Sequence, residues 1–482
     1  MGISQAFRLF RSRSALAGLA VITTIAALLV LLRPDRLDLG GAVCAALALV
    51  LACLPMLQHI ATLRDGRLPV LGLVGLFYAL FFALPPFYSG FVYPAGTPIV
   101  IYGGAPEIAG FDAGVTGLIL AGVAALIAGM ALARQIPAFP KLRLPQSDPE
   151  RLAWVARGLL AAQFAFYAIP GLAQIPSLGQ LAKPISLLAF CLAAVAAFSH
   201  AIGRREALAV FALLLPLRLA LGLESGSLNN ALILVLVVAV LAASRNRRLL
   251  MPMMVAILLG MLAYAPMQVY RHYAWSPHLS ETGLARIKAI ATSMVSTPFS
   301  ETIYVPDGPK SVTRAMVWPL AKRLDQATVL AVVVDRTGRD VEPWAGRTLV
   351  NLVTGLVPRA IWPNKPAERF GNEFGHRYGL LPADDVLMSI NLPWMTEFYA
   401  NFMLPGLILG MLLTGLGLGL LDRLLNRPGQ TDPEAALAAT LLLPLAIPES
   451  NISLMVSNLP LVGTALWLLL HLAFGRRRRV CD

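Results

Sequence analysis

The stretch ALAGLAVITTIAALLVLL, residues 15–32, contains no charged side chain. A helix of about 20 apolar residues crosses the roughly 30 Å hydrocarbon core of a bilayer. Basic residues come before the stretch, as they do in a secretory signal. It is longer than a typical signal core, however, and lacks a small-x-small cleavage site. We expect residues 14–33 to form the first retained membrane span.

Composition extends this interpretation to the whole chain. Of the 482 residues, 57% are hydrophobic and 13% are charged, about half the charged fraction of an average soluble domain. Lipid offers backbone N–H and C=O groups no partners outside their own helix. We therefore predict an all-α, polytopic membrane protein with about twelve transmembrane helices. The expected spans are residues 14–33, 39–62, 68–89, 113–133, 152–171, 182–202, 206–223, 228–244, 249–270, 396–421, 433–447 and 457–474.

Positive charge is distributed unevenly between the loops that join these spans. The net charge is +13. Lys and Arg gather in alternate loops, whereas the loop at 90–112 has neither, and Arg33 and Arg36 are the exception on that side. The residues of the basic loops are Arg64, Arg67, Arg134, Lys141, Arg143, Arg151, Arg204, Arg205, Arg245, Arg247, Arg248, Arg423, Arg427 and the run 476–479. This asymmetry predicts both termini on the cytoplasmic side of the membrane, and no nucleic-acid partner is expected. In a bacterium this would be the inner (plasma) membrane, with the opposite loops on the periplasmic side.

A long polar segment separates the ninth and tenth spans. We expect a transmembrane bundle of nine spans at 1–270, a large periplasmic loop domain at 271–395, and three further spans at 396–482 that end in a basic cytoplasmic tail. ATP and nucleotide-sugars are not available on the periplasmic side. A bond made there must draw its free energy from an activated group that is already carried on a lipid.

The first part of the loop domain is expected to contain an amphipathic helix. From 311 to 334, apolar residues recur at helical spacing, and Arg314 and Arg323 fall on other faces. Such a helix lies at the membrane interface or against the bundle. Its cations contact an anionic substrate, or else they contact lipid headgroups or form a solvated face, and the sequence leaves these interpretations open.

The second part of the loop domain contains a proline-punctuated turn. Prolines on both sides of Lys365 restrict its backbone, and Arg359 lies six residues earlier. Arginine offers phosphate oxygens a planar fork, and lysine offers them a point charge. The alternative is a structured connector in which Arg359 and Arg377 pair with nearby carboxylates.

Polar residues at the ends of spans point to the same face of the membrane. Glu397 and Asn401, four residues apart, share one face of the tenth span, where a carboxylate is costly unless it is partnered or faces water. Arg218 lies late in the seventh span, and Arg271 and His272 follow the ninth. Each has a structural alternative: a hydrogen bond or ion pair to the loop domain for Glu397, snorkelling for Arg218, and an interfacial side chain for His272.

The sequence gives no sign of a cofactor. Three of the four cysteines lie in apolar segments and the fourth sits in the basic tail, so they suggest neither a disulfide framework nor a metal site. There is no phosphate-binding glycine loop, zinc-type cluster or dinucleotide fingerprint. We expect neither a metal nor another cofactor.

Two motifs resemble a known family. They are VPRAIWPNKP at 357–366, followed by Gly371 and Tyr378-Gly379, and TEFYANFMLPG at 396–406. With the arrangement of spans, they are similar to the O-antigen polymerase (Wzy-type) and related oligosaccharide repeat-unit polymerases. The sequence departs from the pattern at Met403, where a glycine is common. Eleven residues separate Arg359 from Gly371, whereas the spacing in some polymerases is ten.

The resemblance implies a GT-C-like membrane glycosyltransferase that polymerises undecaprenyl-pyrophosphate-linked oligosaccharide repeat units into an O-antigen or exopolysaccharide. This chemistry requires cations for the charge that develops on the departing pyrophosphate and a base for the acceptor hydroxyl. The catalytic candidates are Arg359, Arg271, His272 and Glu397, with His272 or Glu397 as the base. The substrate-binding candidates are Arg218, Lys365, Arg314, Arg323, His376, Arg377, Tyr378 and Asn401.

Other functions remain open on the sequence. An O-antigen ligase uses the same donor but a lipid A-core acceptor. A polysaccharide transporter, which is not an enzyme, is expected to carry charged residues along the bundle at the membrane midplane, and an assembly scaffold would tolerate loss of Arg359. The expected partners are the lipid-linked oligosaccharide and membrane lipid. Chain-length regulators and polysaccharide export proteins are further candidates.

Overall fold

The computed structural model is all-helical in the ranges that it describes. These are residues 12–62, 66–92, 111–137, 139–169, 178–223, 228–262, 264–265, 312–357, 361–362, 364, 370–386 and 388–475, with the isolated positions 285, 288–289 and 292. No β-strand occurs in these ranges, and two isolated bridges join Leu37 to Phe111 and Thr337 to Val341. The all-α prediction is therefore confirmed for the described residues.

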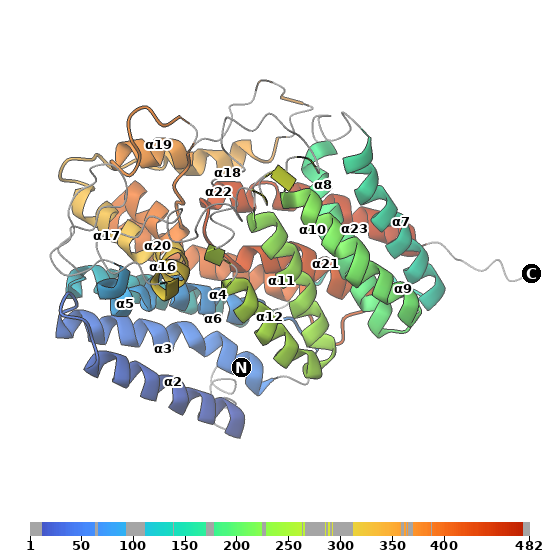
Figure 1. The fold of residues 1–482 in the computed structure, drawn as a ribbon, viewed down its shortest axis with the longest axis horizontal. Coiled ribbons are helices and arrows are strands. Elements are labelled where there is room, and N and C mark those ends of the chain that lie inside the picture. The colour runs from blue at the N-terminus through green and yellow to red at the C-terminus, as the bar shows by residue number, and fades with distance from the viewer. Residues whose placement is uncertain are drawn as a thin grey trace, which may run out of the picture.

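The first group of helices is a stack in which α2, α3, α6 and α20 are successive neighbours (Figure 1). Two short helices, α4 and α5, pack beside it and are joined by a π-helical turn, and α17 covers one end. The members are α2 (Arg13–Leu31), α3 (Leu39–Ala61), α4 (Val70–Tyr78), α5 (Pro85–Val92), α6 (Ala113–Gln135), α17 (Ala327–Arg336) and α20 (Trp394–Leu425). They share one hydrophobic core.

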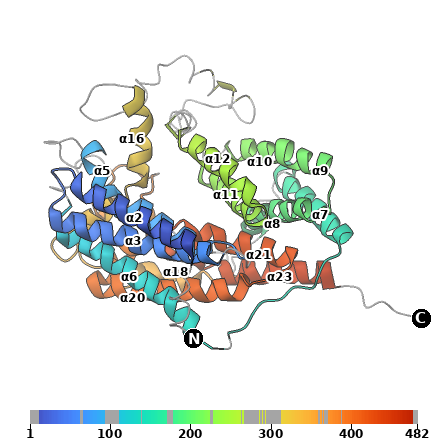
Figure 2. The ribbon, with the colours of Figure 1, turned by 90° about the horizontal axis from the view of Figure 1, so that it is seen from below.

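The second group is built around α8, whose residues 188–196 are all buried. The helices α7, α11 and α21 pack on it, and α23 closes a second hydrophobic core. Figure 2 shows this group beside the first, joined by the long C-terminal helices. The members are α7 (Pro149–Ala168), α8 (Leu178–Phe198), α9 (Arg204–Ala209), α10 (Leu215–Leu223), α11 (Leu228–Arg245), α12 (Leu250–Leu262), α21 (Asp432–Leu442) and α23 (Leu459–Gly475). The short helix α22 (Ile452–Val456) precedes α23 but packs against the first core and α18 (Val350–Thr354).

Glycines bring α6 and α20 close together along the centre of the first group. A Cβ atom on Gly129 would lie 2.1 Å from the carbonyl oxygen of Leu412, and one on Gly415 would lie 2.0 Å from that of Leu126. Any side chain at these positions would push the helices apart. Small residues allow such close backbone contact between membrane helices, where the hydrophobic effect contributes little to association.

Six of the described helices are long and apolar enough to cross a membrane, and a seventh span results if the pair Val70–Ala83 and Pro85–Val92, bent by 43°, is counted as one. Every one of the twelve expected segments contains a helix, but several of these helices are too short to cross a membrane alone. In α21, for example, all ten residues from Pro433 to Leu442 are buried within the protein. Membrane embedding is thus supported by six or seven helices, and the count of twelve stays a prediction.

Residues 312–336, which belong to the predicted loop domain, form two helices rather than one. The expected amphipathic helix at 311–334 is broken at Asp325–Gln326 into α16 (Val312–Leu324) and α17. Asp325 accepts hydrogen bonds from the backbone N–H of Thr328 at 3.0 Å and from its hydroxyl at 2.5 Å, and so fixes the start of α17. Residues 327–333 are buried on all sides, because α17 packs against α20, α6 and α5.

Candidate functional site

The helix α20 is interrupted one quarter of the way along its length, next to the predicted site residues. Phe402 (φ −141°, ψ 17°) and Met403 (φ 56°, ψ −145°) leave the helical conformation. Pro405 explains the position of the break, because a proline ring clashes with the carbonyl group four residues earlier and offers it no N–H. That carbonyl belongs to Asn401.

The break leaves two backbone carbonyl groups of α20 available to the loop domain. Trp344 donates its N–H to the carbonyl of Ala400 at 3.0 Å, and Ala345 donates to that of Asn401 at 3.1 Å. Buried backbone carbonyl groups need a hydrogen-bond donor from protein or water. Here a segment of the loop domain supplies the missing donors.

Asn401 fastens the same segment with its side chain. Its Oδ1 accepts from the N–H of Gly346 at 2.9 Å, and its Nδ2 donates to Thr348 Oγ1 at 2.8 Å and to the carbonyl of Glu397 at 2.8 Å. Gly346 has φ +89°, a left-handed conformation that favours glycine. Asn401 is therefore a positioning residue that holds residues 346–348 on the break.

Glu397 is fully buried, with a relative exposure of 0%. Its Oε2 accepts a hydrogen bond from the N–H of Ile452, the first residue of α22, at 2.7 Å. The two predicted residues thus do share one helix face, and they join three segments: α20, the loop domain and the segment before α22. This hydrogen bond is structural, as the alternative expected, but its partner Ile452 lies outside the predicted loop domain. The role of Glu397 as a base stays a prediction.

An ion pair lies beside this junction. Arg323, in the last turn of α16, contacts the carboxylate of Glu449 three residues before Ile452. Burial raises the pKa of Glu449 above its ordinary value, and the neighbouring Arg323 opposes that rise. A cation and a carboxylate with a raised pKa therefore lie next to each other at the end of the bundle where α20 begins.

Three predicted residues, His376 and Arg377 of α19 (Phe370–Arg377) and the following Tyr378, hold α19 near the start of α20. The Arg377 side chain donates to the carbonyl of Glu342 at 2.6 Å and lies over the Trp344 ring, 5.5 Å from its centroid. Tyr378 is buried, and its hydroxyl shares a hydrogen bond of 2.8 Å with Thr337 Oγ1. His376 Nε2 lies 2.9 Å from the carbonyl oxygen of Asp385. These contacts anchor the loop domain above the break.

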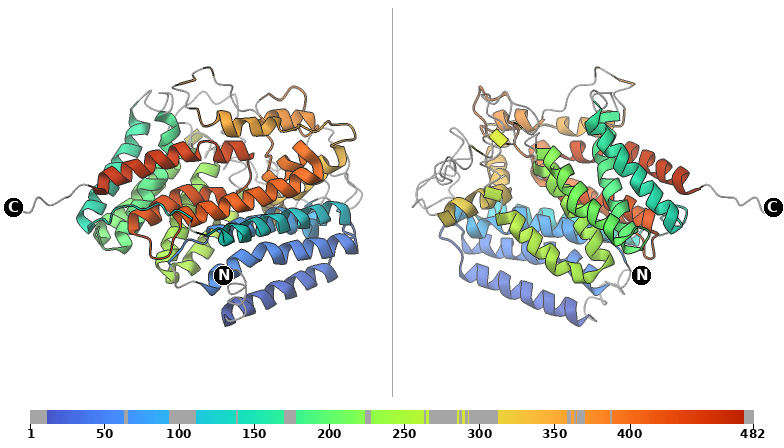
Figure 3. Two further views of the ribbon diagram at one scale, coloured as in Figure 1. Left: turned by 180° about the vertical axis from the view of Figure 1, so that it is seen from behind. Right: turned by 45° about the vertical axis from the view of Figure 1, so that its right-hand side comes forward.

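Arg218 lies elsewhere, in α10 of the second group. It is 8% exposed, and its Nε donates to Ser186 Oγ at 3.2 Å, which in turn bonds to Gln163 Oε1 at 2.8 Å. Figure 3 shows α10 packed with the other helices of the second group, away from α17 and α19. The structure therefore groups Arg323, Glu397, Asn401 and the α19 residues, but it places Arg218 in a separate polar cluster.

The remaining predicted residues cannot be placed in this arrangement. Arg271, His272, Arg359 and Lys365 lie outside the described residues, and Arg314 lies in α16 without a described side chain. Within the described ranges, no group of three His, Cys, Asp or Glu side chains is arranged to hold a metal ion.

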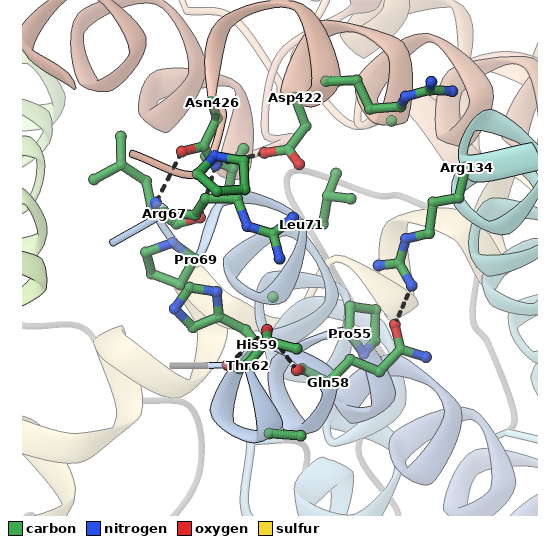
Figure 4. A pocket seen from close by; sticks show the side chains of 17 residues that line it. Pro55, Gln58, His59, Thr62, Arg67, Pro69, Leu71, Arg134, Asp422 and Asn426 are labelled. Atoms are coloured by element: carbon green, nitrogen blue, oxygen red, sulfur yellow. Dashed lines mark hydrogen bonds between the residues drawn. The ribbon is translucent and has the colours of Figure 1, made fainter. Parts of the chain in front are cut away.

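The opposite end of α20 carries a cavity that the sequence interpretation missed. Its volume is about 370 Å³, and Arg67, Arg134 and Asp422 are among the side chains that line it (Figure 4). In the sequence these arginines are indistinguishable from other basic residues of the loops, and they were assigned to membrane orientation alone. Their convergence depends on how α3, α6 and α20 pack.

Comparison with protein families gives a match over residues 112–370, more than half of the chain, to a domain of unknown function, DUF8712. The chain belongs to this family. The DUF8712 match begins one residue before α6 and ends at the first residue of α19, so it contains Arg323 and the segment 344–348 that docks on α20. No curated protein and no solved structure matches the chain.

Proposed function

We propose that this DUF8712 protein is a membrane glycosyltransferase that polymerises polyprenyl-pyrophosphate-linked oligosaccharide units on the periplasmic face of a bacterial inner membrane. The hydroxyl of an acceptor sugar forms the new glycosidic bond, the bond to the lipid pyrophosphate breaks, and the lipid pyrophosphate leaves. The acceptor hydroxyl loses its proton to a base of the protein.

The pairing of Arg323 with Glu449 carries this proposal. The reaction needs a cation where charge develops on the leaving pyrophosphate and a base whose pKa lies close enough to the ambient pH to be effective. Burial raises the pKa of Glu449, which improves it as a base. A pyrophosphate that binds Arg323 would compete with the ion pair and release the Glu449 carboxylate toward the acceptor.

The surroundings of the pair suit a large amphiphilic substrate. It lies where the loop domain, the break in α20 and the segment before α22 meet. Glu397 and Asn401 fix these three segments to one another. Beyond the break, α20 continues from 404 to 425, about 33 Å at 1.5 Å per residue, which matches the thickness of the hydrocarbon core. The break therefore lies at one membrane surface if this part of α20 spans the bilayer.

Reconstitution with lipid-linked repeat units tests the proposal. The wild-type protein should convert them to polymer, and Arg323→Gln and Glu449→Gln should each slow the conversion by about 100-fold or more, the usual cost of losing one group that stabilises a transition state. Arg339→Gln is the matched control, since Arg339 belongs to the same domain but is 63% exposed and pairs with Asp335. Polymerisation at wild-type rates by both folded variants would refute the assignment.

A deletion strain separates a polymerase from a ligase. Loss of a polymerase leaves lipid-linked single repeat units, whereas loss of a ligase leaves long lipid-linked polymer without transfer to lipid A-core. Complementation with Arg359→Ala and Arg271→Ala in the same strain tests the two predicted catalytic arginines that lie outside the described residues. Normal polymer length with both variants would remove them from the site.

A further inference from the structure

We propose that the cavity at the C-terminal end of α20 binds a phosphate group. It is enclosed by the end of α3, the chain entering α4, the last turn of α6 and the last turns of α20. It lies at the opposite end of α20 from Glu397, so it is distinct from the site proposed for glycosyl transfer. Its volume of about 370 Å³ falls in the range of small-molecule pockets.

Two arginines supply the recognition chemistry. Figure 4 shows Arg67 and Arg134 reaching toward the space between α3 and α20 from different sides. They are close enough to each other and to Asp422 to interact electrostatically. With one carboxylate between two guanidinium groups, the cavity retains a net positive charge. His59 also lines it and would add to this charge when protonated.

The third arginine of the lining, Arg423, is already bonded to backbone carbonyl groups. Arg423 donates through NH1 to the backbone carbonyl groups of Ala133 and Ile136, and it thereby binds the end of α6 to α20. Its role is structural, whereas Arg67 and Arg134 form the cationic part of the lining.

Hydrogen bonds hold the Arg134 side chain and the backbone next to Arg67. Gln58 Oε1 accepts a hydrogen bond from Arg134 NH1. Asn426 pairs with both backbone groups of Leu68, at 2.9 Å each, and donates to Asp422 Oδ1 at 2.7 Å. The residue that follows Arg67 is thus clamped to α20. A pair of guanidinium groups suits the oxygens of a phosphate, because each group presents a planar fork of donors.

The size of the cavity indicates a phosphate that carries a further group. One water molecule occupies about 30 Å³, so the cavity exceeds what an inorganic phosphate alone would fill. It also lies at the ends of α3, α6 and α20, three of the helices long enough to cross a membrane. A phosphodiester in a lipid headgroup and a soluble phosphate compound share the recognised chemistry, and the two are separated by experiment.

The test uses the purified, delipidated full-length protein in detergent. One arm measures retention of added phosphatidylglycerol by native mass spectrometry, with phosphatidylcholine as the neutral-headgroup comparison. The other arm titrates inorganic pyrophosphate by calorimetry. The variants are Arg67→Gln and Arg134→Gln. The matched control is Arg143→Gln, an exposed arginine next to Leu142, which bonds to the α20 residue Leu424 at 2.9 Å.

At least one probe should bind the wild type and the control equally, and each cavity variant should bind it at least tenfold more weakly. If the cavity variants bind phosphatidylglycerol more weakly, the ligand is a lipid headgroup. If they bind pyrophosphate more weakly, the ligand is a soluble phosphate. Arg134→Lys keeps the charge but removes the fork, and it should give an intermediate affinity. The proposal is overturned if neither probe binds the wild type, or if folded cavity variants bind as tightly as the control.

Discussion

The backbone conformation of Met403 predicts that glycine is more stabilising than alanine at position 403, whereas alanine is more stabilising than glycine at position 409. Met403 has φ 56° and ψ −145°, a combination that glycine adopts readily and residues with a Cβ atom avoid. Met403→Gly and Met403→Ala both remove the thioether that packs near Gly338. They differ because alanine has a Cβ atom, which makes this backbone conformation unfavourable, whereas glycine has none. We therefore expect the glycine variant to be the more stable of the two.

The size of the difference follows from two opposing effects. A residue held in a sparsely populated backbone region costs about 1–3 kcal/mol. Glycine loses more conformational freedom on folding, which costs about 0.5–1 kcal/mol. The net expectation is about 1 kcal/mol in favour of glycine at 403. At Leu409, which lies in the helical part of α20 and is 57% exposed, alanine should be favoured over glycine by about 1 kcal/mol.

Reversible unfolding in mixed micelles, titrated with SDS and followed by circular dichroism, measures all four variants. The decisive quantity is the free-energy difference between glycine and alanine at each position. Opposite signs at 403 and 409 support the break in α20. Alanine as the better residue at both positions would show that α20 runs through 403 as a regular helix. The carbonyl of Ala400, which accepts from Trp344, would then be bonded within the helix instead.

Three further predictions use the same unfolding measurement. Gly415→Ala should destabilise the protein by about 1–3 kcal/mol through overpacking, since its Cβ would lie 2.0 Å from a carbonyl oxygen of α6. Gly417→Ala is the control, because a Cβ there has nothing within 4 Å, and equal stability of the two variants would contradict the close packing of α6 on α20. Asn401→Ala leaves the N–H of Gly346 without its acceptor and should cost about 1–3 kcal/mol, and an unchanged midpoint would disprove this anchoring role. Burial raises the pKa of Glu449 above its ordinary value, so the stability that this group contributes is present below the ordinary pKa and is lost as the pH rises through the raised one. Wild type should lose stability over that interval relative to Glu449→Gln, and parallel pH profiles would exclude this titration.

The longer apolar helices could be located from the sequence because their signals are local. The expected span at 39–62 corresponds to α3, and the one at 113–133 corresponds to α6. Aspartates fix the starts of both, since Asp38 accepts from Gly41 and Asp112 from Val115, as N-cap residues do. An apolar run and a capping residue act within a few positions of one another, so inspection of neighbouring residues is sufficient.

The positions at which helices are interrupted could not be predicted from neighbouring residues in the same way. The segment at 311–334 has helical periodicity on both sides of Asp325, and hydropathy does not distinguish one helix from two. Pro405 was visible in the sequence, but the break at Phe402–Met403 depends on donors from Trp344 and Ala345, more than 50 residues earlier. Pro405 was thus a local sign that the helix could be interrupted, but it did not show which distant segment satisfies the exposed carbonyl groups.

The candidate site shows the same division between what is local and what is not. The spacing of Glu397 and Asn401 correctly placed them on one helix face, and Asn401 Nδ2 does reach the carbonyl of Glu397. Their other partners, Ile452 and Gly346, lie 55 residues away in opposite directions along the chain. No periodic pattern connects residues at such separations.

By itself, the sequence determined that this chain is helical and apolar enough for a membrane, where its longer helices lie, and that Glu397 and Asn401 share one helix face. These properties depend on hydropathy, capping and helical periodicity, which act over a few residues. Tertiary structure alone decided that residues 344–348 dock on a broken α20, that Arg323 meets Glu449, and that Arg67 and Arg134 converge at the other end. These contacts depend on how distant helices pack, and packing is a property of the whole chain.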